Sequence, residues 1–286
     1  MNILVTGSNG QLGRELQELS RLIPAHRFFF HDLQELDITE SSAVMSAVAR
    51  CQPSVLINAA AYTAVDRAER DPESAFRVNR NGAGVLASAC REAGVLLLHV
   101  STDYVFEGNR PTPYSESDSP SPSSVYGRSK LQGEQLIGEI DPSHIIVRTS
   151  WLYSPYGANF VKTMLRLGAE KSELQVVFDQ TGTPTSAADL AGALLEIAGH
   201  HDPSRHYRQT YHYSNEGTAS WYDFACAVME LSGLECRILP VDSSCYPQEA
   251  PRPSYSVLDK SAIKRDWGIR IPYWRDSLAA MLSNQS

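Results

Sequence analysis

The sequence predicts an α/β protein built on a Rossmann-type doubly wound parallel sheet, followed by a smaller C-terminal region. Two observations carry this prediction. Short apolar runs alternate with amphipathic helical segments through the first half of the chain, and a glycine-rich turn follows the first apolar run. Such alternation is typical of a parallel sheet that helices cover on both faces.

The expected elements follow from the spacing of apolar residues. Strands are predicted at 3–6, 27–31, 55–59, 96–101 and 145–149, and helices at 11–22, 41–50, 75–93 and 124–140. The pattern is weaker after residue 149, where helices are predicted at 159–168, 187–198 and 221–231. Ser220 is the expected N-cap of the last of these helices, with Asp223 in its first turn.

Composition excludes several classes of protein. The 286 residues carry a formal charge of −8, whereas binding to nucleic acid or to anionic membrane relies on clustered lysine and arginine. No apolar run approaches the ~20 residues that span a bilayer, and the first residues lack a signal-peptide pattern. The five cysteines include no Cys-x-x-Cys pair, so we expect a reduced, cytoplasmic protein without a thiolate metal site.

The glycine-rich turn predicts a phosphate-binding site. It follows the first strand directly and has the spacing Gly-x-x-Gly-x-x-Gly. Gly7 permits the tight turn, Gly10 lets a pyrophosphate approach the backbone, and Gly13 allows close packing of helix on strand. We expect a dinucleotide-binding domain over residues 1–150, with cofactor contacts from the whole turn: Gly7, Asn9, Gly10, Gln11, Leu12 and Gly13.

Asp32 ends the second predicted strand, where a carboxylate accepts hydrogen bonds from the adenosine ribose of a dinucleotide. No arginine follows it over residues 33–36, which favours NADH, although Arg14 or Arg27 could assist NADPH. The alternative is that Asp32 is a solvated turn residue or a helix N-cap. Asp37 and Ile38 are further cofactor candidates in the same segment.

Two strand ends supply further candidates. The third predicted strand runs into Ala60, Ala61, Tyr62 and Thr63, which begin with small side chains and let a cofactor lie close to the backbone. Thr102 follows the fourth predicted strand and can donate to a substrate oxygen. The alternative for Thr102 is a hydroxyl bonded only to nearby backbone.

Tyr126 and Lys130 form a possible acid catalyst. Four-residue spacing places both side chains on one helix face. An ammonium beside a phenol favours the phenolate and lowers the tyrosine pKa from its usual value of about 10. The alternative is a half-buried tyrosine beside a solvated lysine.

Taken in order, the glycine turn, the segment 58–63, the run 101–106 and the run 126–130 resemble the extended short-chain dehydrogenase/reductase family. Within it, the stretches 58–69, 148–153, 159–165 and 179–185 are similar to the dTDP-4-dehydrorhamnose reductases. This resemblance implies NADH- or NADPH-dependent reduction of the C4 ketone of a dTDP-6-deoxy-4-keto sugar. Tyr126 would give a proton, Lys130 would hold the cofactor ribose, and Thr102 would polarise the carbonyl.

The resemblance also implies which residues bind substrate. We expect the sugar nucleotide to contact Thr63, Val65, Thr102, Asp103, Trp151, Asn159, Lys162 and Arg252. Four of these residues belong to residues 151–286, which we expect to be mainly a substrate-binding region with some segments that return to the first domain.

Some members of this family hold a magnesium ion between subunits through glutamates. Glu15 suits that role, but the second acidic position falls at Ala188, with Asp189 shifted by one. We therefore expect no catalytic metal, and a monomer or weak homodimer. The rival functions are another nucleotide-sugar reductase or epimerase, or a regulatory subunit resembling the β subunit of methionine adenosyltransferase.

Overall fold

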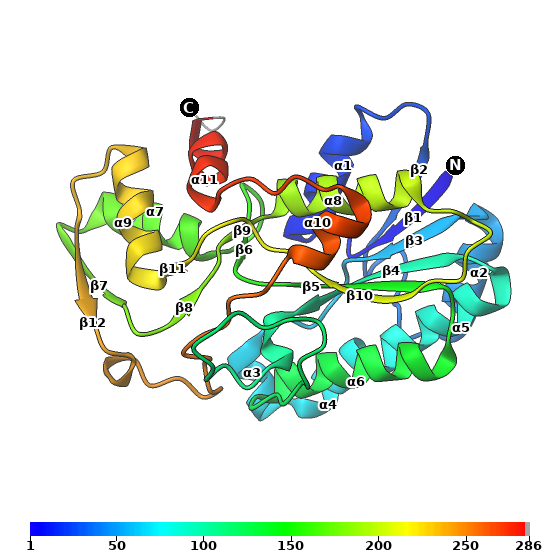
Figure 1. The fold of residues 1–286 in the computed structure, drawn as a ribbon, viewed down its shortest axis with the longest axis horizontal. Helices are drawn as coiled ribbons and strands as arrows, with labels where there is room; N and C mark the ends of the chain where they lie inside the picture. Colours follow the sequence, from blue (N-terminus) through cyan, green and yellow to red (C-terminus); the bar gives the residue numbers. More distant parts are fainter. Residues whose placement is uncertain (284–286) are drawn as a thin grey trace.

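Six parallel strands form the central sheet of the computed structural model, which describes residues 1–283 (Figure 1). Their order is β2-β1-β3-β4-β5-β10. The bounds are β1 (Asn2–Thr6), β2 (Arg27–His31), β3 (Val55–Asn58), β4 (Leu96–Thr102), β5 (His144–Thr149) and β10 (Arg208–His212). The predicted doubly wound α/β fold is confirmed, and each of the five predicted strands is present.

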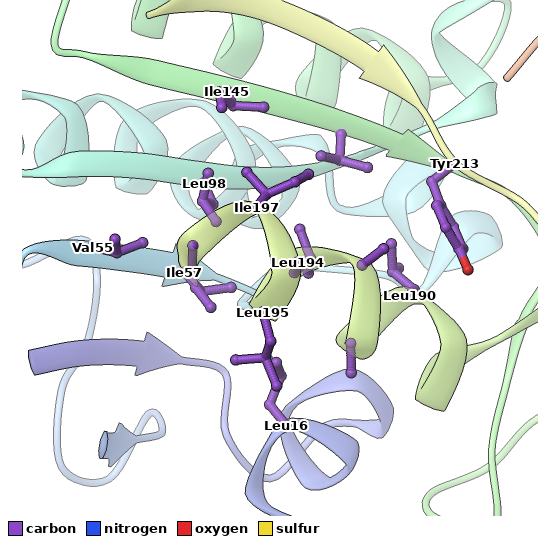
Figure 2. Packing of buried hydrophobic residues seen from close by; sticks show 14 of the residues in the cluster. Leu16, Val55, Ile57, Leu98, Ile145, Leu190, Leu194, Leu195, Ile197 and Tyr213 are labelled. Carbon is purple, nitrogen blue, oxygen red and sulfur yellow. The ribbon is translucent and has the colours of Figure 1, made fainter. Parts of the chain in front are cut away.

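Helices cover both faces of the sheet. On one face lie α1 (Gln11–Ser20), α8 (Ala187–His200) and α10 (Ser261–Trp267), and on the other lie α2 (Ser41–Cys51), α5 (Ala83–Ala93) and α6 (Val125–Ile140). Figure 2 shows Leu190, Leu194 and Ile197 of α8 directed at apolar side chains of the strands. The central strands appear in the sequence as short continuous apolar runs because both faces of each strand are buried.

Segments from the second half complete this sheet domain. Helix α8 packs against α1 and the sheet, and β10 pairs with β5 in parallel from Arg208 to His212. Strand β10 is not among the predicted strands, because its five residues, Arg-Gln-Thr-Tyr-His, carry no apolar run. An edge strand needs less apolar surface, since only one neighbour pairs with it.

The single helix predicted at 75–93 is wrong in its first part. It divides into α4 (Pro72–Phe76), a π-helical segment η1 (Arg77–Gly82) and α5. Within η1 the side-chain amide of Asn79 accepts from the backbone N–H of Tyr62 at 2.8 Å and donates to Tyr62 O and Ser129 Oγ. Such π-helical turns are often found at functional sites.

The remaining elements form a smaller lobe around a third apolar cluster. Its helices are α7 (Phe160–Glu170), α9 (Trp221–Ser232) and α11 (Trp274–Ser283), packed on the parallel pair β7 (Glu173–Val177) and β12 (Arg237–Val241). Short pairs join the lobe to the sheet domain: β6 (Leu152–Tyr153) with β9 (Thr185–Ser186), and β8 (Thr181–Gly182) with β11 (Ala219–Ser220). Ser220 and Asp223 form a capping box at α9, which confirms the predicted N-cap.

Three short elements complete the chain: α3 (Val65–Arg70) and the 3₁₀ turns η2 (Asp103–Val105) and η3 (Ser243–Cys245). Across the 283 described residues, every helix is too short or too polar to cross a bilayer.

A buried ion pair joins α6 to the sheet. Glu134 of α6 accepts from Arg148 of β5 in a bidentate arrangement, at 2.6 Å from Nη2 and 3.0 Å from Nε, and both side chains are about 5% exposed. The Arg148 guanidinium also lies over the Phe106 ring, 5.1 Å from its centroid. Planar, bidentate contacts of this kind fix orientation as well as distance.

Replacing Glu134 with alanine is expected to destabilise the protein by about 3–5 kcal/mol, because Arg148 would be left buried without a counter-charge. Urea unfolding of the variant measures this loss. Glu170→Ala is the matched control: its partner Arg166 lies in solvent, and its loss should cost ~0.5 kcal/mol or less. A loss for Glu134→Ala no larger than the control would contradict a structural role for the ion pair.

Candidate active site

A cavity with a volume of about 830 Å³ lies at the carboxyl edge of the sheet. Ligands of open parallel sheets bind at this edge. Seventeen of the residues selected from the sequence line it: Gly7, Gly10, Gln11, Leu12, Asp32, Asp37, Ile38, Ala60, Ala61, Tyr62, Thr63, Val65, Thr102, Asp103, Tyr126, Lys130 and Trp151. Five selected residues do not: Asn9, Gly13, Asn159, Lys162 and Arg252.

The glycine turn has the geometry of a pyrophosphate cradle. Gly7 has a φ of +73°, and a Cβ there would lie 2.5 Å from the backbone nitrogen of Ala60. A Cβ on Gly13 would lie 2.3 Å from Gly7 O, so this glycine allows α1 to pack against the turn. Gly10 faces the cavity, and a Cβ there would meet only Gly7 O, at 3.4 Å. These residues therefore fit a dinucleotide at the N-terminus of α1.

Asp32 lies at the far end of this cradle. Its carboxylate accepts from the backbone N–H of Asn9 at 2.6 Å and from that of Leu33 at 2.7 Å. Asn9 does not line the cavity; its backbone N–H holds the carboxylate of Asp32, which does. The arrangement ties the glycine turn to the end of β2 and leaves the carboxylate at the cavity wall.

A basic residue that the sequence analysis missed lies near this end of the cavity. Arg77 of η1 lines the cavity and lies 3.8 Å from Asp37, whereas Arg14 and Arg27 do not line it. Arg77 stands about 45 residues beyond Asp32 in the sequence, so no local motif could have identified it. Its place in the π-helical segment brings its guanidinium to the cofactor cavity.

Local hydrogen bonds set the start of α6. Ser124 caps the helix by accepting from the backbone N–H of Gly127 at 3.1 Å, and Glu69 accepts from the N–H of Val125 at 2.7 Å. A Cβ on Gly127 would lie 2.2 Å from Tyr104 O, so only glycine lets α6 approach this closely. The first two turns of α6 then present Tyr126 and Lys130 to the cavity.

Tyr126 is buried, and burial raises the pKa of its phenol above the usual value. The Thr102 hydroxyl lowers the pKa of this phenol by a smaller amount, while Asp103 raises it further. The expectation that Lys130 lowers the pKa of Tyr126 is wrong for this structure, because desolvation dominates. The phenol is therefore protonated at neutral pH, the form that a proton donor requires.

Lys130 is 2% exposed and directs its amine away from solvent. Its Nζ donates to the carbonyl oxygen of Val100 at 2.7 Å and lies 3.5 Å from Nε2 of His99. Burial lowers the pKa of Lys130 to about 8, although the nearby Glu134 carboxylate raises it in part. The solvated lysine considered in the sequence analysis is excluded.

Thr102 and Asp103 lie together at the end of β4. The Thr102 hydroxyl donates to Asp103 Oδ1 at 3.0 Å and accepts from the backbone N–H of Tyr104 at 3.2 Å. Burial raises the pKa of Asp103 to about 6, and its Oδ2 is buried without a hydrogen-bond partner. An unpaired buried oxygen is costly, so this carboxyl suits a ligand hydroxyl.

Trp151 lines the cavity in a strained conformation, with a φ of +46°. A bulky residue in this region costs roughly 1–3 kcal/mol, and such strain is concentrated at functional sites. Its indole stacks on that of Trp221, with centroids 3.5 Å apart and planes 6° from parallel. Trp221 was missed as a site residue, because its sequence position shows only that a helix begins there.

Asn159 and Lys162 lie outside the main cavity. Asn159 caps α7 through the backbone N–H of Lys162, and its amide donates to Gln11 Oε1 at 2.9 Å. Lys162 is exposed and donates to Pro155 O at 3.1 Å. Asn159 thus reaches the cavity only through Gln11, and Lys162 lies at the surface.

Arg252 lies in a second cavity of about 660 Å³, which shares Val65, Tyr104 and Trp221 with the first. Its Nη2 donates to Asp66 at 2.5 Å, while Nη1 is buried without a partner. The two cavities therefore meet at a shared wall, and the second offers an unsatisfied cationic donor.

Glu15 and Asp189, the two carboxyl groups considered for a magnesium ion between subunits, lie close enough for their charges to interact. Glu15 is largely buried, and burial is the main cause that raises its pKa. The negative charges of Glu18 and Asp189 raise this pKa further. Asp189 itself accepts from Asn215 at 2.6 Å and from Ser277 at 2.5 Å. No group of three or more metal-binding side chains is found within residues 1–283.

The whole chain resembles one family of enzymes. A family model described as the RmlD substrate binding domain matches residues 1–286. A dTDP-4-dehydrorhamnose reductase from Sinorhizobium fredii is 43% identical over 97% of this chain and 95% of its own length. A solved dTDP-4-dehydrorhamnose reductase from Clostridium acetobutylicum has a TM-score of 0.94 at 40% identity, covering 100% of this chain and 99% of that one. Its counterpart from Bacillus anthracis, in complex with NADP, has a TM-score of 0.93 at 39% identity, covering 99% of each chain.

Replacing Gly10 with alanine is expected to weaken NADPH binding about tenfold or more while leaving the fold intact. The new methyl group has room in the free protein but occupies the space through which a pyrophosphate reaches the helix N-terminus. Quenching of NADPH fluorescence measures the dissociation constant. Gly192→Ala, in α8 with nothing within 4 Å, is the control and should bind NADPH normally. Equal affinities for wild type and Gly10→Ala would show that the pyrophosphate lies elsewhere.

Proposed function

The chain belongs to the family of the RmlD substrate binding domain, and we propose that it reduces the C4 ketone of dTDP-6-deoxy-L-lyxo-4-hexulose to dTDP-L-rhamnose with NADH or NADPH. The chain is an oxidoreductase of the dTDP-4-dehydrorhamnose reductase type, as the resemblance implied. The observation that carries this conclusion is full-length similarity to named reductases, in a chain whose Thr102, Tyr126 and Lys130 line one cavity with the glycine cradle.

The geometry supports the following roles in the reaction. The nicotinamide, when bound, supplies a hydride for the carbonyl carbon. Tyr126 gives its phenolic proton to the carbonyl oxygen, and its raised pKa keeps that proton available at pH 7. Thr102 lies beside the phenol and orients the same oxygen. Lys130 holds the cofactor ribose with its amine.

The sugar and the nucleotide are proposed to occupy different cavities. The sugar lies in the first, beside Trp151, whose indole suits the apolar face of a pyranose. The nucleoside diphosphate extends past Val65 and Tyr104 into the second, where Arg252 has an unpaired buried nitrogen for an anionic oxygen. This division favours a nucleotide-linked sugar over a free sugar.

Either nicotinamide cofactor suits the adenosine end. Asp32 presents a carboxylate to a ribose with a free 2′-hydroxyl, which favours NADH. Arg77 lines the same cavity and offers a partner for a 2′-phosphate, which favours NADPH. The solved relative from Bacillus anthracis contains NADP. We propose that NADPH is accepted through Arg77, a residue that the sequence argument for NADH did not consider.

We further propose that the protein works in the cytoplasm as a monomer or weak homodimer. All five cysteines are free thiols, and Cys51, Cys90 and Cys236 are buried, which suits a reducing compartment. Asp189 accepts from Asn215 and Ser277 of its own chain through Oδ2, which holds this carboxylate within the protomer.

An assay with the sugar nucleotide separates the three candidate functions. A reductase consumes one NADPH for each 4-keto sugar, an epimerase regenerates its cofactor, and a regulatory subunit consumes none. Tyr126→Phe removes the donated proton and should cut turnover roughly 10²- to 10⁴-fold. Its dissociation constant for NADPH should match that of wild type. Near-normal turnover in Tyr126→Phe would remove this residue from the mechanism.

The pH profile of kcat/KM is expected to fall as pH rises through about 8. Burial lowers the pKa of Lys130 to about 8, so the ammonium that donates to the cofactor ribose is lost above this value. Values of kcat/KM report ionisations of the free enzyme, which is the state that this pKa describes. Initial rates in a constant-ionic-strength buffer series provide the measurement. A profile that stays level up to pH 10 would be inconsistent with a lowered lysine pKa.

A further inference from the structure

His99 lies between Asn58 of β3 and Lys130 of α6. It was not among the site residues predicted from the sequence. It is 1% exposed in the middle of β4. Its Nδ1 lies 3.0 Å from the amide nitrogen of Asn58 on β3, and its Nε2 lies 3.5 Å from Nζ of Lys130 on α6. The imidazole therefore joins a neighbouring strand to the lysine of the catalytic helix.

The orientation of the Asn58 amide is fixed by its other contacts. Its Oδ1 accepts from the backbone N–H of Ala60 at 3.0 Å and from the hydroxyl of Thr6 at 2.8 Å. A backbone N–H can only donate, so this atom must be the carbonyl oxygen. The nitrogen of the Asn58 amide consequently faces His99 and donates to it.

His99 must then carry its proton on Nε2, because Nδ1 is the acceptor for Asn58. The other two buried histidines have the opposite arrangement. Nδ1 of His144 lies 2.8 Å from Pro142 O, and Nδ1 of His212 lies 3.0 Å from Tyr114 O. A carbonyl oxygen only accepts, so these two rings carry their proton on Nδ1.

We propose that His99 is a positioning residue for Lys130: as a neutral Nε2–H donor held by Asn58, it sets where the lysine amine lies and how readily that amine holds its proton. An N–H directed at Nζ favours the uncharged amine, whose lone pair can accept it. The Val100 carbonyl, 2.7 Å from Nζ, favours the ammonium. The position of the amine reflects the balance between these two contacts.

Other charged groups near this lysine do not replace His99 in that role. Glu134, one turn along α6, favours the ammonium but is itself paired with Arg148 of β5. Tyr126 on α6 is protonated, and Asp103 follows β4 on the cavity side. His144 on β5 interacts with His99 rather than with the lysine. His99 is thus the histidine whose ring nitrogen lies at the amine.

Nitrogen-15 NMR of the histidine-labelled full chain tests the arrangement without cofactor or substrate. The signals missing from the His99→Gln spectrum identify His99. Its Nδ1 should be unprotonated and its Nε2 protonated, unchanged from about pH 6 to pH 9, because burial lowers the pKa of this ring well below the usual value. His144 and His212 provide internal controls with the opposite tautomer. A proton on Nδ1 of His99, or titration of the ring in this range, would overturn the proposal.

The kinetic test rests on the proposed reduction and uses the pH profile. In His99→Gln the side-chain amide can turn its oxygen to the lysine and stabilise the ammonium. The alkaline limb of kcat/KM should therefore move up by about half a pH unit or more. His144→Gln, a buried histidine opposite Leu97 at the other end of the sheet, is the control and should leave the limb in place.

The NMR test and the kinetic test can each contradict the proposal independently of the other. A folded His99→Gln enzyme whose alkaline limb coincides with that of wild type overturns the positioning role. If the protein reduces no 4-keto sugar nucleotide, the proposed function fails while the NMR result for His99 still stands. If His99→Gln does not fold, the tautomer is still decided on wild type, with His99 identified as the buried histidine whose ring nitrogens bond no carbonyl.

Discussion

The buried ion pair between Glu134 and Arg148 fixes helix α6 against the sheet, and the site depends on this constraint. Glu134 lies one turn beyond Lys130 and two turns beyond Tyr126, so a shift of the helix would move all three together. Ser129, the residue before Lys130 in α6, accepts a hydrogen bond from Asn79 of the π-helical segment. A buried pair of this kind adds little net stability over an apolar contact, yet it fixes orientation. Its value here is therefore geometric: it places a phenol and an amine at the wall of a cavity that the glycine turn also lines.

The sheet domain could be predicted because its signals are local. Apolar runs mark buried parallel strands, and Gly7, Gly10 and Gly13 stand at the offsets that a dinucleotide-binding turn requires. The failures come from contacts that are distant in sequence. Strand β10 exists because β5 offers it an edge, and the π-helical segment exists because Asn79 bonds Tyr62, seventeen residues earlier. Neither leaves a periodic pattern in its own residues.

The same distinction applies to the site. Residues belonging to a motif, such as Tyr126 and Thr102, lie at the cavity, whereas Arg77 and Trp221 line it only because the fold returns them there. Sequence reasoning also predicted a lowered pKa for Tyr126 from its spacing to Lys130. Spacing determines which face of the helix a side chain occupies, but not how deeply it is buried, and desolvation outweighs the charge of a lysine whose amine bonds elsewhere. The raised value keeps the phenol protonated at neutral pH, as a phenol of ordinary pKa would also be.

The stacked indoles of Trp151 and Trp221 have a mechanical consequence. Trp151 follows the last central strand of the sheet domain, and Trp221 begins a helix of the smaller lobe, so the stack is a direct contact between the two halves of the molecule. Parallel rings 3.5 Å apart leave no gap for a third ring. A planar or chair-shaped group can enter between them only if the two indoles, or the lobes that carry them, move apart. The stacking of the two indoles therefore reports on the contact between the lobes. Because indoles fluoresce, separation of the two rings would be visible without any added label.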